Sequence, residues 1–162
     1  MISKLEILES IAHETQIIKH IAGKLSEADL AYRPSEKQRS MLDLLQYLTC
    51  CSSVPATFIA NDNWDAAERL SSASADVNLS NFATAMDAQL SFLHETFLNF
   101  DDQALSQKDS SMPWGKAVKA GAAIVSMCLS TLVAYRMQLF LYAKAAGLIE
   151  LNRYDCWAGT DG

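Results

Sequence analysis

The first segment of the chain repeats apolar residues at steps of three and four. A helix has 3.6 residues per turn, so residues at these steps lie on one face. We therefore predict a first helix over residues 2 to 25, with an apolar face made of Ile7, Leu8, Ile11, Thr15, Ile18, Ala22 and Leu25.

A second helix is predicted from Ser40 to about Ala60. The Ser40 hydroxyl is placed to cap its first turn, with Asp43 at the third helical position, a variant of the capping box. Pro55 lacks a backbone donor and crowds the carbonyl four residues earlier, at Cys51. We expect a kink or break between Cys51 and Pro55, in a helix whose periodic positions are Met41, Leu45, Leu48, Ser52, Pro55 and Ile59.

A long polar connection precedes the third helix. Residues 61–79 are mostly small and polar, which favours a connecting arm with one short helix at about residues 65–70. Ser80 is a suitable cap for the helix that follows, which carries the strongest periodic pattern in the chain. Its apolar positions, spaced by three or four residues, are Phe82, Met86, Leu90, Leu93, Phe97 and Phe100.

The fourth helix is predicted over residues 116 to 146. Residues 101–111 are typical of a polar loop, and the Pro-Trp-Gly sequence at 113–115 indicates a turn before the helix. Gly147 is placed to end it. The remaining tail is expected to fold back on the other helices, because Trp157 supplies apolar surface for docking.

These four helices predict an all-α fold, an antiparallel four-helix bundle with a long connection between helices two and three. We find no alternating run of strand length to compete with them. At 162 residues with 50% hydrophobic composition, the chain is expected to form a single domain, residues 1–162. The nearly all-apolar fourth helix is expected to be the most buried.

The charge, the hydropathy and the cysteines of the chain indicate which partners it binds and in which cellular compartment it is found. The net charge is −6 and the 13 basic residues are scattered, which argues against a nucleic-acid partner. The stretch from Ala120 to Tyr135 has no charge, but its sixteen residues are fewer than a membrane span requires, so we expect a buried helix and no membrane. Glu6 and Glu9 interrupt any amino-terminal signal sequence, which indicates a cytoplasmic protein whose four cysteines are reduced thiols.

Several short stretches, in this order along the chain, resemble the DinB/YfiT-like family. They are AYRP at 31–34 followed by SMLDLLQYL at 40–48, MPWG at 112–115, YRMQ at 135–138 leading to Gly147, and YDCWAG at 154–159. The resemblance implies a four-helix bundle, often dimeric. It also implies a divalent metal held by one histidine of helix two and two histidines four residues apart on helix four.

The positions that match those histidines are Tyr47, Thr131 and Tyr135. None of the three offers the imidazole that metals such as zinc or nickel favour. We therefore expect a degenerate site with no metal and no cofactor.

The leading hypothesis is a DinB-like helical-bundle protein whose space between helices two and four binds a small molecule. The predicted ligand-binding residues are Tyr47, Thr131, Tyr135, Arg136 and Gln138, the last two because they match the family pattern beside its final histidine. Whether the protein is an enzyme is left open.

Two alternatives come from other classes of protein. One is a metal-dependent thiol transferase or hydrolase of the DinB/YfiT type, with a rearranged site that includes His94. The other is a homodimeric interaction module, in which Ile17 and Ile21 of helix one pack on a second copy. His13 and His20 fall on a stripe that faces solvent or a partner.

Overall fold

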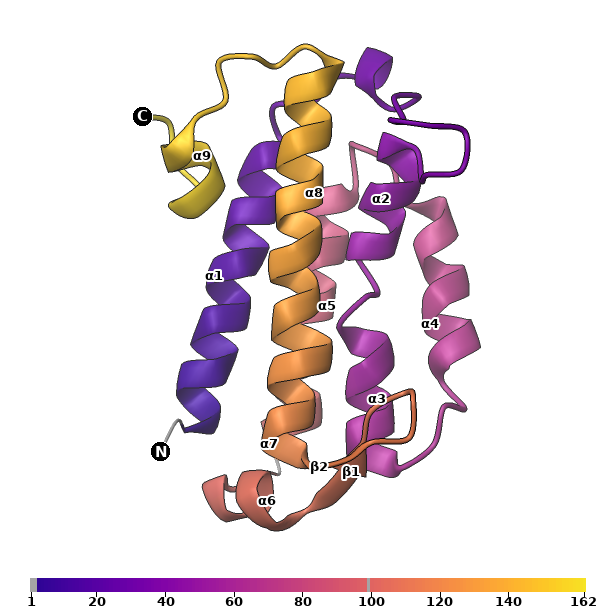
Figure 1. Cartoon of the computed structure of the whole chain (residues 1–162), viewed down its shortest axis with the longest axis vertical. Helices are drawn as coiled ribbons and strands as arrows, with labels where there is room; N and C mark the ends of the chain where they lie inside the picture. The colour runs from indigo at the N-terminus through magenta and orange to yellow at the C-terminus, as the bar shows by residue number, and fades with distance from the viewer. Residues whose placement is uncertain (1–2, 99) are drawn as a thin grey trace.

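The computed structural model describes residues 3–98 and 100–162, and it is a bundle of helices (Figure 1). The expected start of the first helix at residue 2 lies outside the described residues. The all-α prediction is confirmed. The helices that build the bundle are α1 (Lys4–Ala22), α2 (Met41–Leu48), α3 (Ser53–Asn61), α5 (Phe82–Leu98), α7 (Ala120–Ala123), a π-helical segment (Ile124–Leu129) and α8 (Ser130–Ala146).

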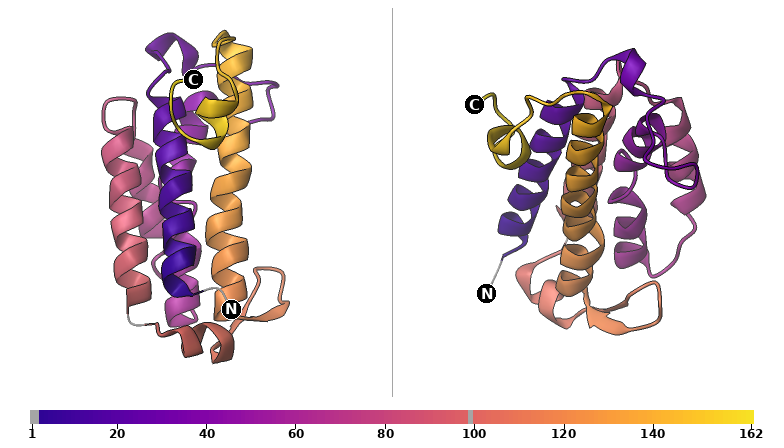
Figure 2. Two further views of the ribbon diagram at one scale, coloured as in Figure 1. Left: turned by 90° about the vertical axis from the view of Figure 1, so that its left-hand side faces the viewer. Right: turned by 45° about the horizontal axis from the view of Figure 1, so that its top comes forward.

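The helices form four rods, because α3 continues α2 and because α7, the π-helical segment and α8 form one long helix. The rods α1 and α7–α8 run in one direction, and α2–α3 and α5 run in the other (Figures 1 and 2). Their buried apolar residues belong to a single cluster. This cluster is the bundle core.

Helix α2 begins as the sequence predicts. The Asp43 amide donates to the Ser40 hydroxyl at 3.1 Å, and the Ser40 amide donates to the Asp43 carboxylate at 2.9 Å. The predicted break is also confirmed, since α2 ends at Leu48 and α3 starts at Ser53. Pro55 therefore stands in the first turn of α3, where its missing donor costs no helical hydrogen bond.

Gln89 of α5 satisfies the backbone at this break, and its side chain is 4% exposed. Its amide oxygen accepts from the Ser52 and Ser53 amides at 3.0 and 3.2 Å, and its nitrogen donates to the Leu48 carbonyl at 2.8 Å. The apolar spacing of this helix predicts Leu90 on the buried face. The structure buries Gln89 and leaves Leu90 half-buried, because the break needs hydrogen-bond partners inside the core.

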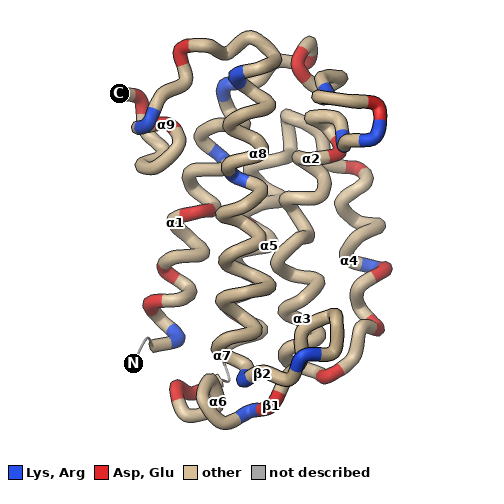
Figure 3. The backbone as a smooth tube through the Cα atoms, viewed as in Figure 1, with Lys and Arg blue, Asp and Glu red and all other residues tan. Residues whose placement is uncertain are grey.

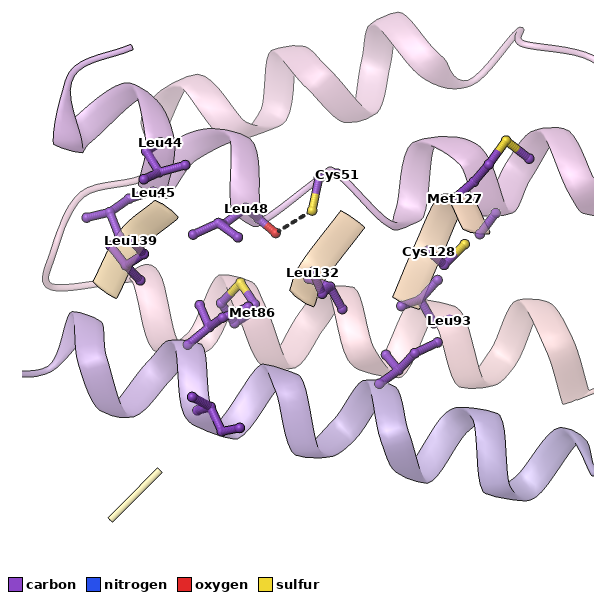
Figure 4. Packing of buried hydrophobic residues seen from close by; sticks show 14 of the residues in the cluster. Leu44, Leu45, Leu48, Cys51, Met86, Leu93, Met127, Cys128, Leu132 and Leu139 are labelled. Carbon is purple, nitrogen blue, oxygen red and sulfur yellow. Dashed lines mark hydrogen bonds between the residues drawn. The ribbon is translucent and has the colours of Figure 1, made fainter. Parts of the chain in front are cut away.

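The break also faces the π-helical segment. The Ser52 hydroxyl donates to the Cys128 carbonyl at 3.0 Å, and the Cys128 thiol donates to the Ser52 carbonyl at 3.5 Å. Figure 4 shows Cys51 on the segment that links α2 to α3, where its thiol points to the Leu48 carbonyl 3.5 Å away. Both irregular stretches of the bundle therefore meet at one level.

The long connection between the second and third rods contains the expected short helix, α4 (Ala67–Ala73), which begins and ends two to three residues later than predicted and is followed by a 3-10 turn (Ser74–Asp76). The predicted cap of the following helix is wrong. Helix α5 begins at Phe82, and the Ser80 hydroxyl donates to the Asn78 side chain at 2.6 Å rather than accepting from the helix.

The predicted loop before the long helix contains regular structure. It forms α6 (Asp102–Gln107) and a hairpin of β1 (Asp109–Ser111) with β2 (Ala117–Lys119), which pairs Ser110 with Val118. The long helix therefore begins at Ala120 instead of residue 116. Strands of three residues are too short to give a detectable alternation, which is why the sequence did not predict them.

The long helix is less buried than expected. Eight of the 19 residues of α1 are buried, against ten of the 27 from Ala120 to Ala146. The helix from Ala120 to Ala146 spans 27 residues and is long and apolar enough to cross a membrane, which corrects the length argument drawn from its charge-free part. Core helices of bundles meet the same criteria, and this one packs along α1 and α2.

The carboxy-terminal segment folds back as predicted but docks through different residues. Helix α9 (Arg153–Trp157) packs on α1 and α8. Leu151 and Cys156 are buried there, whereas Trp157 is 63% exposed. Gly159 has φ +66° and lies so close to Ile17 that an added Cβ would come within 3.1 Å of its Cα atom. The segment therefore covers α1 at close range.

Candidate functional site

A pocket of about 550 Å³ lies between the broken second rod and the long helix. Its volume is within the roughly 300–1,000 Å³ typical of small-molecule sites. Further walls come from the arm that carries α4 and from the turn of the β1–β2 hairpin. The apolar part of the lining comprises Val54, Pro55, Trp64, Met112, Trp114 and Met127.

Two tryptophans stand at the rim of this pocket. Trp64 follows α3 and stacks on Phe58, with ring centroids 4.5 Å apart and planes 10° from parallel. Trp114 occupies the hairpin turn, next to Gly115, whose φ of +85° is a conformation that glycine adopts readily. The Trp114 side chain is 73% exposed, so its ring is available to a ligand.

The polar part of the lining belongs to α2, the arm and the long helix. It comprises Asp43, Gln46, Ser71, Ser74, Ser126 and Thr131. The Asp43 carboxylate is hydrogen-bonded to Ser40, and these bonds hold its pKa below the ordinary value. The Ser40 hydroxyl has the larger effect and the Ser40 amide the smaller. Asp43 is the one charged side chain among the described lining residues.

Two adjacent thiols, Cys50 and Cys51, form part of the pocket wall at the helix break. Burial raises the pKa of Cys50, and it raises the pKa of Cys51 to about 12. Both thiols therefore stay protonated at neutral pH, and since the thiolate is the nucleophile, neither is activated for covalent chemistry.

Tyr47 and Tyr135 meet at one end of the pocket. Their rings make an edge contact with centroids 4.7 Å apart and planes at 62°. The Arg39 guanidinium lies 4.1 Å from the Tyr47 ring centroid and donates to the Tyr135 hydroxyl at 3.4 Å. Burial, followed by the proximity of Cys51 and Tyr135, raises the pKa of Tyr47. At this end of the pocket, the Arg39 guanidinium therefore covers two phenol rings in contact.

The residues at the family's metal positions do not fit a divalent metal. A phenol must lose its proton to bind a cation well, and the raised pKa of Tyr47 opposes this. The Arg39 guanidinium over the two rings repels a second cation. The Thr131 hydroxyl donates to the Met127 carbonyl at 2.9 Å.

The predicted ligand-binding set is only partly brought together. Tyr47 and Thr131 line the pocket, and Tyr135 contacts Tyr47 beside it. Gln138 lies about one turn beyond Tyr135 and donates to the Tyr142 hydroxyl at 2.8 Å. The prediction of Arg136 as a ligand-binding residue is wrong, because its side chain lies on the side of α8 that faces α1 and α9.

Arg136 is buried, with its side chain 2% exposed, between α1 and α9. Its Nε atom lies 2.7 Å from a Glu14 carboxylate oxygen, without the alignment of a hydrogen bond. Its Nη1 atom donates to the Cys156 carbonyl, and the guanidinium lies 4.7 Å from the Trp157 ring centroid. These contacts join α1, α8 and α9, so we assign Arg136 a structural role.

None of the three histidines reaches the pocket. His94, predicted for a rearranged metal site, is exposed on α5. His13 approaches the Trp157 carbonyl at 3.2 Å, and His20 approaches Asp155 at 2.8 Å. The two amino-terminal histidines therefore face the carboxy-terminal segment.

His20, Asp155 and Asp161 form a cluster in which the possible metal-ligand atoms lie within 4.8 Å of one another. The Lys24 ammonium already lies 3.1 Å from Asp155 and 2.5 Å from Asp161. Burial by itself raises the pKa of Asp155, but hydrogen bonds from Asn152, His20 and Lys24 outweigh it and hold the pKa at about 2. The cluster is therefore an ion-pair network that fastens α9.

Sequence reasoning missed the two tryptophans and the two thiols of the pocket. Trp64 and Trp114 lie in segments predicted as connections, where a large aromatic residue has little core to fill. Such a residue is a usable indication of a binding surface. No pattern in the sequence indicated that the two segments would meet.

Comparisons with known proteins identify the fold. No family model matches the chain, and no curated protein matches it. Among solved structures, it is similar to the crystal structure of a DinB-like protein, YjoA, from Bacillus subtilis. The match has a TM-score of 0.70 at 14% identity and covers 92% of this chain and 97% of that chain. The DinB-like bundle expected from the sequence is confirmed as a fold.

Proposed function

Starting from a DinB-like fold, we propose that this protein binds a small organic molecule in the pocket between α2–α3 and the long helix, without a metal. The observation that carries the proposal is the pocket itself, whose volume of about 550 Å³ is combined with two rim tryptophans and a few polar groups. Such a combination is typical of ligand sites. The site is degenerate with respect to metal chemistry, because its donors are phenols and hydroxyls beneath Arg39.

Binding of a neutral fluorescent probe tests this proposal. N-phenyl-1-naphthylamine is expected to bind with a dissociation constant in the micromolar range and to quench tryptophan emission, because Trp64 and Trp114 line the pocket. Ser71→Phe, which fills the pocket from α4, should weaken binding by about tenfold or more. Ser72→Phe is the matched control, since Ser72 is also exposed but does not line the pocket.

The same preparation, purified without chelator, should contain well under one transition-metal ion per chain by elemental analysis. Stoichiometric zinc, nickel or iron would overturn the metal-free part of the proposal. Equal probe binding by the wild-type chain and Ser71→Phe would overturn the pocket as the binding site.

We also propose that two copies of the chain associate through the long helix. The predicted contact through Ile17 and Ile21 is wrong, because both side chains are buried in the chain itself. The outer face of the long helix instead exposes Val133 and Leu141, and no charged residue lies between Ala120 and Tyr135 (Figure 3). A helix face with exposed apolar side chains, next to a charge-free stretch of the same helix, favours self-association.

Leu141→Asp is expected to shift the protein from dimer to monomer by light scattering at about 50 μM, since a charge on this face would have to be desolvated in the contact. Leu5→Asp on α1 is the control, because Leu5 is similarly exposed, at 61% against 55%. A wild-type chain that is monomeric at this concentration would contradict the proposal.

We propose a cytoplasmic location because of the state of the cysteines. All four are free and buried in the structure. Free thiols of this kind persist in a reducing compartment.

A further inference from the structure

We propose that the ligand of this pocket is an uncharged, mainly apolar molecule with a flat ring and a hydrogen-bond donor, and that the pocket rejects anions. This inference rests on the proposed function, because it concerns the same site. It names the chemical class of the ligand, which the fold does not.

The first step is the charge of the lining. The phenol of Tyr47 and the thiols of Cys50 and Cys51 remain neutral, because burial raises the pKa of each. Asp43 is the one charged group among the described lining residues, and it is negative. An anionic ligand would leave water without a positive partner in the lining.

Arg39 and Arg33 are cations that lie close to the pocket but are not part of its lining. The positive charge of Arg39 lowers the pKa of Cys50 and Cys51, but burial outweighs this effect. The guanidinium stacks over Tyr47 at 4.1 Å and over Tyr135 at 5.6 Å, so it is directed to the rings instead of the cavity. Arg33 lies 3.9 Å from Asp43 and acts on that carboxylate.

The second step concerns the donors and acceptors of the lining that are not already used in hydrogen bonds within the chain. The Gln46 amide nitrogen already donates to the Ala75 and Val77 carbonyls at 2.9 and 3.2 Å. The Thr131 hydroxyl donates to Met127, and the Ser74 hydroxyl donates to Ser71 at 2.7 Å. These groups have donated their hydrogens, so the oxygens of Gln46, Thr131 and Ser74 remain as acceptors.

The exposed hydroxyls of Ser71 and Ser126 can donate or accept, whereas the spare oxygens of Gln46, Thr131 and Ser74 favour a ligand that brings donors. A hydroxyl or amine of the ligand can pair with these oxygens, whereas a carboxylate, sulfonate or phosphate would place acceptor against acceptor. The remaining wall is apolar and aromatic, and the exposed ring of Trp114 offers a stacking surface. A flat apolar molecule with a neutral donor satisfies both parts of the wall.

Two probes that share one ring system test this selection. N-phenyl-1-naphthylamine is neutral and carries one N–H donor, and 8-anilinonaphthalene-1-sulfonate adds a sulfonate to the same skeleton. We expect the neutral probe to bind about tenfold or more tightly than the sulfonate at the pocket. The signal retained by Ser71→Phe is subtracted from each titration as binding elsewhere on the surface.

A positive charge placed in the pocket should reduce the preference for the neutral probe. Ser126 lines the pocket and is exposed, so Ser126→Lys adds an ammonium there and should raise the affinity for the sulfonate about tenfold. Ser130→Lys is the matched control, since Ser130 is exposed on the same long helix outside the lining. Thermal unfolding of both variants confirms that they fold.

The outcomes separate the two proposals. Tighter binding of the neutral probe, with the preference reduced by Ser126→Lys and not by Ser130→Lys, supports the inference. Equal or tighter binding of the sulfonate by the wild-type pocket overturns the inference and leaves the proposed function standing. Failure of both probes to bind overturns the proposed function and the inference with it.

Discussion

Replacing Gln89 with alanine is expected to lower the free energy of unfolding by about 3 to 5 kcal/mol. The substitution removes the shared partner of three buried backbone groups, the amides of Ser52 and Ser53 and the carbonyl of Leu48. Each unsatisfied buried group costs roughly 1–3 kcal/mol, and water entering the vacated space offsets part of the sum.

Urea unfolding followed by circular dichroism measures this change. Gln16→Ala is the matched control, because Gln16 is exposed in the middle of α1, and its replacement should change stability by less than about 0.5 kcal/mol. Gln89→Glu keeps the two acceptor bonds and loses the donor to Leu48, so its loss should be intermediate between wild type and alanine. A loss below about 1 kcal/mol for Gln89→Ala would show that the break finds its partners elsewhere.

Arg136→Met is expected to destabilise the fold by about 3 to 5 kcal/mol. The change leaves the Glu14 carboxylate nearly buried without its cation, which lies 2.7 Å away in the intact chain. It also removes the donor to the Cys156 carbonyl, so α9 loses one of its attachments. Removing one member of a buried ion pair costs more than removing both.

A double-mutant cycle and a protease measure this effect. Glu14→Gln combined with Arg136→Met should recover part of the stability lost in the single Arg136 variant. Proteolysis should cut residues 148–162 faster in Arg136→Met than in the wild-type chain. Probe affinity at the pocket should be unchanged in the folded fraction. A tenfold loss of probe affinity with unchanged stability would instead restore Arg136 as a ligand residue.

The helices of this bundle were predictable where they are long and periodic. The first helix, the Ser40 cap and the break before Pro55 follow from local spacing and capping chemistry, which act within a few residues. The hairpin, the start of the long helix and α6 were not predictable, because strands of three residues and a helix of six leave no periodic pattern.

In the third helix, one position predicted for the core differs by one residue from the position that is buried. The apolar spacing favoured Leu90, whereas the helix buries Gln89. A choice between neighbours depends on what lies opposite, and the partner of Gln89 is a break 36 and 37 residues earlier in the chain. Local pattern carries no information about that pairing.

The pocket was predictable only in its central part. Tyr47 and Thr131 line it as the family resemblance placed them. Arg136 was misplaced because the resemblance fixes a position along the helix but not the face that the position presents. The two tryptophans come from connections that the sequence does not place in space.

The division of the second rod has a consequence for the order of folding. Helix α3 has nine residues, with a proline in its first turn, and isolated helices shorter than about 12 residues are marginal in water. The amides at its start find their acceptor only on α5, which must first close a loop of more than thirty residues. We therefore expect α3 to have low φ-values and the ligand cavity to form after the transition state for folding. A nascent chain released before α5 is synthesised would lack this cavity.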